Sequence, residues 1–220
     1  MVILAGGRGL RLGPELPKAL RTLCGETLLA RAVRRFGEWS DDVLVSAPAG
    51  LHVEAGGVRV LTDPAAFGPW PGPLVALAWA LQHSSRPWTL VVAVDMPLAR
   101  LELFDYLWAR RGEPATQAPE APSDAAPLGV VPWRRHGPEP LLALYRSEAG
   151  PALLALAQAG ERAAIRAVPG LPLVRVPEES WRAADPLGVS FLNCNTPEEW
   201  SRIEIRIAAE REGHRQNLEE

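Results

Sequence analysis

The chain begins with Met1-Val2-Ile3-Leu4-Ala5-Gly6-Gly7-Arg8-Gly9-Leu10-Arg11-Leu12-Gly13-Pro14-Glu15-Leu16-Pro17-Lys18, and this stretch decides the fold. Residues 2–4 form a short apolar stretch that contains the β-branched Val2 and Ile3, which is typical of a buried parallel strand. Residues 5–18 hold four glycines and two prolines, so they are predicted to form a loop. Successive glycines after a strand allow several backbone N–H groups to turn towards one point, and such a nest binds anions. An anion site is therefore predicted at the carboxyl end of the first strand.

Arg11 and Lys18 add two cations to this loop, beside Arg8, and the pair suits a triphosphate better than a single carboxylate. Of the 23 basic residues, only Lys18 is a lysine. Lysine is a compact point charge, whereas arginine is a broad planar fork. A lysine at position 18 in an arginine-rich chain therefore supports contact with a crowded α-phosphoryl group. The P-loop pattern GxxxxGK(S/T) is absent because Ala19 follows Lys18, and Gly13 stands one residue too late for a dinucleotide fingerprint. A glycine-rich turn without a ligand is the alternative.

Further along the chain, short apolar runs that suit strands alternate with segments that repeat apolar residues at helical spacing. This alternation is typical of βαβ units with right-handed crossovers. We therefore expect an α/β fold, a Rossmann-like three-layer sandwich with a mostly parallel central sheet. A single domain is predicted over residues 1–207, with a flexible loop at about 112–127 and a C-terminal tail at 208–220. The expected strands are 2–4, 42–47, 58–61, 89–94, 128–131, 141–145, 173–176 and 190–192, and the expected helices are 27–36, 74–82, 100–110, 151–167 and 197–211.

The most convincing central strand, residues 89–94, ends at Asp95. A carboxylate at the tip of a buried strand costs free energy unless a cation compensates it. Mg²⁺ takes one or two carboxylates and completes its shell with phosphate oxygens and waters, so Asp95 is predicted to be a magnesium ligand. A helix-capping role is the alternative for Asp95. Asp63, which precedes Pro64, is expected either to hold a nucleoside group or a metal-bound water, or to form an Asx turn.

Composition argues against several other classes of protein. The net charge is −3, so there is no basic excess with which to neutralise a nucleic acid. No apolar run approaches the roughly 20 residues that a membrane span requires. The two cysteines, Cys24 and Cys194, form no CxxC pair, and the four histidines lie in no motif. The sequence shows no signal peptide, so we expect a cytoplasmic protein in a reducing compartment.

The loop pattern Leu4-Ala5-Gly6-Gly7, Arg11-Leu12-Gly13 and Lys18 resembles the signature of the molybdenum cofactor guanylyltransferases and their MobA-like relatives. Further segments agree with that family in order, and with the loop they span residues 4–200. They are Gly72-Pro73-Leu74 after Asp63, Asp95-Met96-Pro97, Leu156-Ala157-Gln158-Ala159-Gly160-Glu161-Arg162, and Asn193-Cys194-Asn195-Thr196-Pro197-Glu198-Glu199.

The resemblance implies a fold like that of the nucleotide-diphospho-sugar transferases. It also implies an enzyme that transfers GMP from GTP to the phosphate of molybdopterin, with Mg²⁺ as cofactor and pyrophosphate as the second product. Transient contact with other enzymes of the molybdenum cofactor pathway, or with acceptor enzymes, belongs to the same expectation. The residues expected on the acceptor side are Asn193 and Asn195. Those expected around GTP are Leu4, Ala5, Gly6, Gly7, Lys18, Ser46, Asp63 and Asp95.

The expected mechanism is in-line attack of an acceptor phosphate oxygen on the α-phosphorus of the nucleotide. Asp95 would hold Mg²⁺, Lys18 would neutralise the α-phosphoryl charge, and Arg11 would hold the leaving pyrophosphate. A phosphate nucleophile is already ionised at neutral pH, so no general base is required. The protein then contributes positioning and charge stabilisation.

The sequence departs from the family at Gly9, where serine is frequent, at Leu12, where methionine is frequent, and at Ser46, where asparagine is expected. Residues 16–20 look more like the sugar-phosphate and isoprenoid nucleotidyltransferases. A cytidylyl- or sugar-phosphate-type transferase therefore stays open, as does a nucleotide-binding module without catalysis. The basic turn Arg134-Arg135-His136 would either meet an anionic acceptor or lie in solvent.

Overall fold

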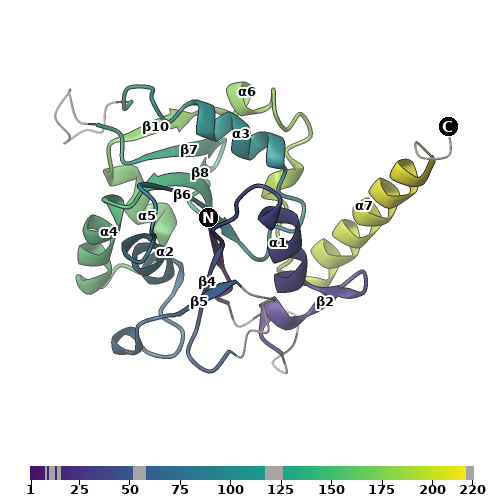
Figure 1. Ribbon diagram of the computed structural model, residues 1–220, viewed down its shortest axis with the longest axis horizontal. Helices are drawn as coiled ribbons and strands as arrows, with labels where there is room; N and C mark the ends of the chain where they lie inside the picture. Colours follow the sequence, from purple (N-terminus) through teal and green to yellow (C-terminus); the bar gives the residue numbers. More distant parts are fainter. Residues whose placement is uncertain (8, 10–12, 14–15, 52–57, 117–125, 217–220) are drawn as a thin grey trace.

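The structure is a computed structural model, and it describes residues 1–220 except 8, 10–12, 14–15, 52–57, 117–125 and 217–220. A central sheet runs through the molecule in the strand order β10-β7-β9-β6-β1-β4-β5, and β8 pairs with β7 (Figure 1). The strands are β1 Val2–Leu4, β2 Thr22–Leu23, β3 Glu26–Thr27, β4 Leu44–Ala47, β5 Arg59–Thr62, β6 Trp88–Ala93, β7 Gly129–Arg134, β8 Gly137–Pro138, β9 Leu142–Arg146 and β10 Leu173–Val176.

Helices cover both faces of this sheet. The α-helices are α1 Leu28–Gly37, α2 Pro73–Gln82, α3 Leu101–Ala109, α4 Ala149–Gln158, α5 Ala164–Ala167, α6 Glu178–Trp181 and α7 Pro197–Gln216. Four 3₁₀ turns are also described, η2 Lys18–Leu20, η3 Ala65–Phe67, η4 Val168–Gly170 and η5 Val189–Phe191. Among the residues described, no helix combines the length and the apolar character needed to cross a bilayer.

The core has two halves, one on each face of the sheet. Successive side chains of a strand point to opposite faces, and β1 shows this directly. Ile3 joins the half that packs against α1, α3 and α7, whereas Val2 and Leu4 join the half that packs against α2, α4 and α5. The prediction of a three-layer α/β sandwich is therefore confirmed.

The sheet is mostly parallel, as predicted. β1 pairs in parallel with β4 and β6, β4 with β5, and β7 with β10. The exceptions are β9, which runs antiparallel between β6 and β7, and the two-residue β8, which pairs antiparallel with β7. The sequence did not predict the reversal of β9, because a buried strand has the same apolar pattern in either direction.

Three predicted elements differ in the structure. The helix expected over 151–167 is interrupted after α4, because Gly160 adopts a positive φ of 102° and the Glu161 carboxylate accepts hydrogen bonds from the backbone of Arg162 and Ala163. The strand expected at 190–192 is the 3₁₀ turn η5, held by buried Asp185, which accepts from the N–H groups of residues 189 and 190 at 3.2 and 2.8 Å.

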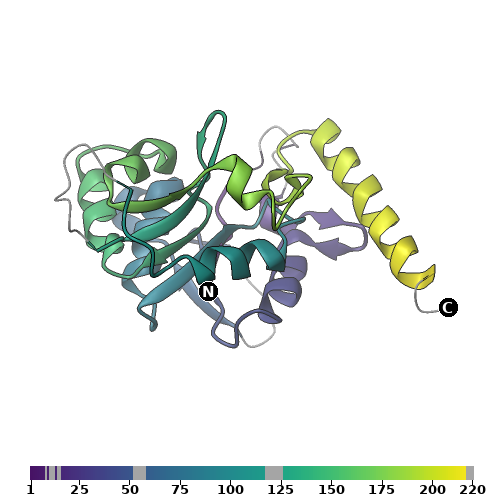
Figure 2. The ribbon, with the colours of Figure 1, turned by 90° about the horizontal axis from the view of Figure 1, so that it is seen from above.

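The third difference is the length of the last helix. α7 begins at the predicted position, where Thr196 and Glu199 cap each other's backbone N–H groups at 3.3 and 3.1 Å. It continues to Gln216, five residues beyond the predicted end at 211 and into the segment expected as a tail. Figure 2 shows that the C-terminal part of α7 extends away from the sheet.

Candidate active site

The carboxyl ends of four neighbouring parallel strands meet at one edge of the sheet, and most of the predicted site residues that the structure describes lie there. β1 leads into Ala5, whose N–H donates to the Ser46 carbonyl at the end of β4 at 2.8 Å. Asp63 follows β5, and its N–H donates to the Ala47 carbonyl at 2.8 Å. Asp95 follows β6, beside β1. Open α/β sheets place their ligands at this edge.

The centre of the site is an ion pair between Lys18 and Asp95. The Lys18 ammonium lies 2.8 Å from Oδ2 of Asp95 and also donates to Oδ1 of Asn195. The two charged side chains are only 9% and 20% exposed. The Lys18 N–H donates to the Gly7 carbonyl at 3.4 Å, which brings this end of the loop back to its glycines. Lys18 of the glycine loop, Asp95 after β6 and Asn195 before α7 thus form one cluster. The sequence predicted that Lys18 and Asp95 would lie together.

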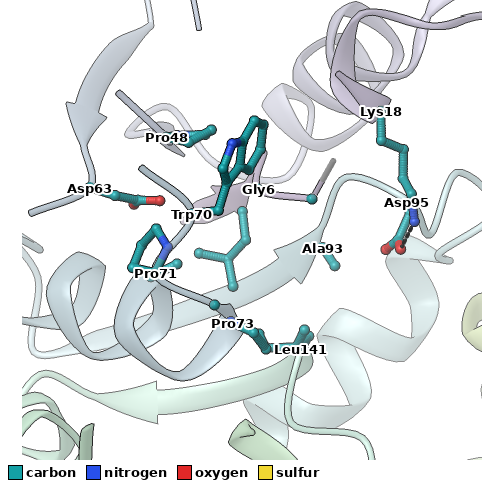
Figure 3. Close-up of a pocket in the computed structure, with 14 residues that line it drawn as sticks. Gly6, Lys18, Pro48, Asp63, Trp70, Pro71, Pro73, Ala93, Asp95 and Leu141 are labelled. Carbon is teal, nitrogen blue, oxygen red and sulfur yellow. Dashed lines mark hydrogen bonds and ion pairs between the residues drawn. The ribbon is translucent and has the colours of Figure 1, made fainter. Parts of the chain in front are cut away.

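A cavity of about 280 Å³ opens beside this ion pair, and we call it the glycine-loop cavity. Figure 3 shows Asp63 on one side of it and the Lys18–Asp95 pair on the other, with Trp70 between them. The charged side chains of the lining are thus at its two ends, and the wall between them is largely apolar. Its lining includes Leu4, Gly6, Gly7, Lys18, Asp63, Trp70 and Asp95.

Asp63 and Ser46 form a buried pair at the far end of the glycine-loop cavity. The Ser46 hydroxyl donates to Oδ1 of Asp63 at 2.7 Å, and the two residues are 0% and 5% exposed. Burial raises the pKa of the Asp63 carboxyl, and the hydrogen bond from Ser46 opposes that rise. The described residues donate no hydrogen bond to Oδ2 of Asp63. This oxygen therefore suits a ligand that brings an N–H or O–H donor.

The beginning of α2 forms another part of this cavity. Gly72 has a φ of +91°, and a side chain there would approach the Arg162 carbonyl at 3.4 Å, so glycine fits this turn. Pro73 occupies the first helical position, where its missing N–H costs nothing. The Leu74 N–H donates to the Arg162 carbonyl at 3.3 Å and is therefore already used in packing. The helix dipole still favours negative charge at this end of the cavity.

A second cavity, of about 290 Å³, adjoins the first, and we call it the hairpin cavity because the β7–β8 hairpin forms much of its wall. It shares Pro73, Asp95 and Leu141 with the glycine-loop cavity. The predicted acceptor residue Asn193 lines it, as do Arg134 and His136 of the basic turn and Glu139. Asp95 therefore stands where the two cavities meet.

Most of the predicted site residues lie close together in the structure, and one, Arg11, is not among the described residues. Asn195 contacts Lys18, whereas Asn193 lines the hairpin cavity, so the two asparagines serve different parts of the site. Within the described part of the chain, Oδ1 of Asn193 is buried without a hydrogen-bond partner. No motif in the sequence points to the side chains of Trp70 and Glu139, because each residue stands in a proline-rich turn.

The residues at this edge fit a magnesium ion that is completed by a substrate. Among the described residues, no group of three His, Cys, Asp or Glu side chains forms a metal cluster. Mg²⁺ does not need one, because it binds through one or two carboxylates and takes phosphate oxygens and waters for the rest. Asp95 supplies such a carboxylate, and Asn193, whose buried Oδ1 accepts no hydrogen bond from the described residues, lines the same cavity. The neighbouring Cys194 is a poor ligand, because burial, with a smaller effect of Asp95, raises the pKa of its thiol to about 12.

Comparison with known proteins now decides the family. The family model described as the MobA-like NTP transferase domain matches residues 1–176. The chain belongs to the MobA-like NTP transferase family. A probable molybdenum cofactor guanylyltransferase from Synechococcus elongatus is 32% identical over 212 residues, which cover 93% of this chain and 97% of the relative. A relative with the same description from Chloroflexus aggregans is 33% identical, covering 94% of this chain and 93% of its own length.

Solved structures agree with this membership. Molybdopterin-guanine dinucleotide biosynthesis protein A from Archaeoglobus fulgidus superposes with a TM-score of 0.77 at 25% identity, covering 94% of this chain and 98% of its own. The 2-C-methyl-D-erythritol 4-phosphate cytidylyltransferase from Thermus thermophilus superposes with a TM-score of 0.62 at 18% identity, covering 94% and 98% of the two chains. The second likeness concerns the fold alone, and the predicted nucleotide-diphospho-sugar transferase-like architecture of this MobA-like chain is confirmed.

Proposed function

We propose that this MobA-like protein is a molybdenum cofactor guanylyltransferase. It transfers GMP from GTP to the phosphate of molybdopterin and releases pyrophosphate. The observation that carries the proposal is the Lys18–Asp95 pair, 2.8 Å apart at the point where two cavities of similar size meet. A transferase that joins two substrates needs such a meeting point. The relatives named as guanylyltransferases supply the identity of both substrates.

The glycine-loop cavity takes GTP in this proposal. Gly6 and Gly7 line this cavity and belong to the loop that leads to Lys18, so the triphosphate is assigned to that end, with the backbone of Leu4 and Ala5 directly before the glycines. The nucleoside then extends towards Asp63, whose carboxylate accepts its donors, and Ser46 holds that carboxylate in place. Arg11 is assigned to the leaving pyrophosphate because it belongs to the same loop.

The hairpin cavity takes molybdopterin, with the phosphate of the acceptor towards Asp95. Asn193 lines this cavity and orients the acceptor, whereas Asn195 accepts a hydrogen bond from Lys18 and orients that side chain. Asp95 would hold Mg²⁺, which when bound screens the charge of the phosphates. The Lys18 ammonium, which is shared by Asp95 and Asn195 in the absence of ligands, is the group available to neutralise the α-phosphoryl oxygens.

The reaction then requires positioning more than covalent chemistry from the protein. An oxygen of the acceptor phosphate attacks the α-phosphorus of GTP, a new P–O bond forms, and the bond to the β-phosphate oxygen breaks. The leaving pyrophosphate departs opposite the attacking oxygen. No proton has to be removed from an ionised phosphate. Lys18 stabilises charge that develops on the α-phosphoryl group, the type of effect that contributes most in such sites. We place this activity in the cytoplasm, with transfer of the product to acceptor enzymes.

A screen of nucleotides tests the proposal. Each of the four NTPs is added with Mg²⁺, and the shift in melting temperature is measured together with pyrophosphate release in the presence of molybdopterin. We expect GTP to stabilise the protein most and to be the nucleotide that supports release. Preference for CTP or UTP would reassign the chain to a cytidylyl- or sugar-phosphate-type transferase. Binding without release would indicate a nucleotide-binding module instead.

A further inference from the structure

The hairpin cavity contains one partly buried carboxylate that the reaction does not require. Glu139 follows β8, its side chain is 19% exposed, and it lines the cavity between the buried Pro138 and Pro140. Oε1 accepts a hydrogen bond from Nη1 of Arg134 at 2.7 Å, whereas the described residues donate nothing to Oε2. The Glu139 N–H donates to the Pro132 carbonyl at 2.9 Å, which fixes the backbone of this residue. Glu139 thus offers a free acceptor oxygen from a fixed position.

The surroundings of Glu139 leave its charge incompletely compensated. Burial raises the pKa of the carboxyl, and the hydrogen bond and charge of Arg134 oppose that rise without cancelling it. Partly buried carboxylates are stabilised by further hydrogen-bond donors. The neighbouring wall offers few donors, because it consists largely of proline, leucine, isoleucine and alanine side chains. A ligand with N–H groups would therefore find a matching acceptor here.

The acceptor assigned to this cavity carries such an edge. Its pterin ring is a 2-amino-4-oxopteridine, which presents an exocyclic NH₂ group and a ring N–H beside a carbonyl oxygen. A carboxylate matches the two donors, and a guanidinium matches the carbonyl. Glu139 and Arg134 stand side by side with these two kinds of group.

We propose that Glu139, held in place by Arg134, recognises the 2-amino-4-oxo edge of the acceptor's pterin ring and so selects the acceptor. This inference rests on the proposed function, because it assumes that the acceptor occupies the hairpin cavity. Glu139 acts as a specificity residue at the end of the acceptor remote from the phosphate. It is not required for the chemical step.

The test compares Glu139→Gln with a matched control in the full-length protein. Glutamine keeps the size of the side chain and the acceptor for Arg134, but it replaces a charged oxygen by an NH₂ donor that opposes the pterin donors. Glu113→Gln is the control, because Glu113 makes an ion pair of the same 2.7 Å length with Arg110 and lines none of the cavities described here. The KM for molybdopterin, the KM for GTP and kcat are measured for each protein.

We expect Glu139→Gln to raise the KM for molybdopterin by about 10-fold or more, the effect of losing a charge-assisted hydrogen bond. The KM for GTP and the melting temperature should stay within twofold and about 2 °C, respectively, of the values for Glu113→Gln. An unchanged KM for molybdopterin would overturn the inference, and so would an equal rise in both KM values.

A second experiment tests recognition of the 2-amino group in the wild-type protein. It therefore remains informative if Glu139→Gln unfolds. The wild-type transfer reaction is inhibited with 6-hydroxymethylpterin or with 6-hydroxymethyllumazine, which has an oxo group in place of the 2-amino group. We expect the pterin to compete with molybdopterin and to inhibit at least about 10 times more strongly than the lumazine. Equal inhibition by both, or none by either, would contradict the inference. In Glu139→Gln the preference should fall towards unity.

The two proposals fail in different ways. If GTP supports pyrophosphate release while Glu139→Gln behaves like Glu113→Gln, the guanylyltransferase proposal stands and the role of Glu139 falls. If no NTP supports release with molybdopterin, the proposed function falls, and the inference about its acceptor falls with it.

Discussion

The two cavities beside Asp95 are similar in volume and differ in how they are built. Each contains one carboxyl whose pKa burial raises, Asp63 in the glycine-loop cavity and Glu139 in the hairpin cavity. Asp63 follows a strand of the central sheet and is held by the neutral Ser46, whereas Glu139 follows a short hairpin strand and is held by the cation Arg134. Guanine and pterin share the same 2-amino-oxo edge, so a carboxylate suits either ring.

The ring edge alone therefore does not decide which substrate enters which cavity. The phosphates decide, because Gly6 and Gly7 of the glycine loop line the glycine-loop cavity and do not line the hairpin cavity. We therefore propose that the sheet edge fixes the nucleotide, while the hairpin, which can vary without disturbing the sheet, selects the acceptor. Three substitutions, together with Glu139→Gln, test this division of labour.

The largest effect is expected at the residue shared by both cavities. Asp95→Ala removes the carboxylate assigned to the metal, so kcat should fall by roughly two to three orders of magnitude, the scale of a lost charge-stabilising group. Steady-state pyrophosphate release measures the loss. Asp41→Ala, an exposed carboxylate before β4 at the opposite edge of the sheet, should leave kcat unchanged. Near-normal turnover by Asp95→Ala would reject the assignment.

A smaller effect, confined to one substrate, is expected from Asp63→Asn. The amide keeps the hydrogen bond from Ser46 but presents a donor or a neutral oxygen to the nucleoside, so the KM for GTP should rise by about 10-fold or more. The KM for molybdopterin should not change. Together with Glu139→Gln this makes a crossed pair, in which each variant affects one KM. Effects of both variants on the same KM would show that the cavities are not divided as proposed.

Trp70 is expected to contribute to nucleotide binding alone. Its half-buried indole stands between Asp63 and the Lys18–Asp95 pair (Figure 3), where a base can stack on it. Base–aromatic stacking contributes about 1–3 kcal/mol, so Trp70→Ala should weaken GTP binding by roughly 5- to 100-fold. Calorimetric titration with GTP and Mg²⁺ measures this, and Trp108→Ala, which changes a tryptophan of α3 that lines neither cavity, serves as the control. Equal affinities of the two variants would place the base elsewhere.

The smallest effect is on the stability of the free protein. Because burial raises the pKa of Asp63, the ionised carboxyl destabilises the folded state. This destabilisation is absent at pH values below the pKa of the unfolded state. It develops as the pH rises towards the pKa of the folded state and is complete above it. Asp63→Asn should therefore be more stable than the wild type at pH 7 by about 0.5–1 kcal/mol. Urea unfolding at several pH values should show this gain shrinking towards pH 4. A variant that is less stable at pH 7 would contradict the cost assigned to Asp63.

The sequence predicted those parts of the site whose positions follow from the order of the strands. Lys18 and Asp95 are 77 residues apart, yet they were expected to meet because each follows the carboxyl end of a predicted parallel strand. Asp63 also lies at this edge, as expected from its place after the strand predicted over 58–61, whereas Ser46 was suggested by the family resemblance alone. In contrast, the pairing of Glu139 with Arg134 depends on a hairpin of two-residue β8, which is too short to leave a period in the sequence.

The errors in secondary structure have a related cause. The break between α4 and α5 depends on the side chain of Glu161, which replaces backbone hydrogen bonds over a few residues. The turn η5 depends on buried Asp185, four and five residues earlier in the chain. In both segments the apolar pattern suits the predicted element, and a single polar side chain overrides it.

A crystal structure with Mg²⁺ and a GTP analogue that carries a methylene group between the α- and β-phosphates tests the division of the two cavities most directly. We predict the guanine beside Asp63 and Trp70, the α-phosphate within reach of the Lys18 ammonium, and the hairpin cavity free of nucleotide. Guanine beside Glu139, or a triphosphate that contacts neither Lys18 nor the Asp95-bound metal, would contradict it.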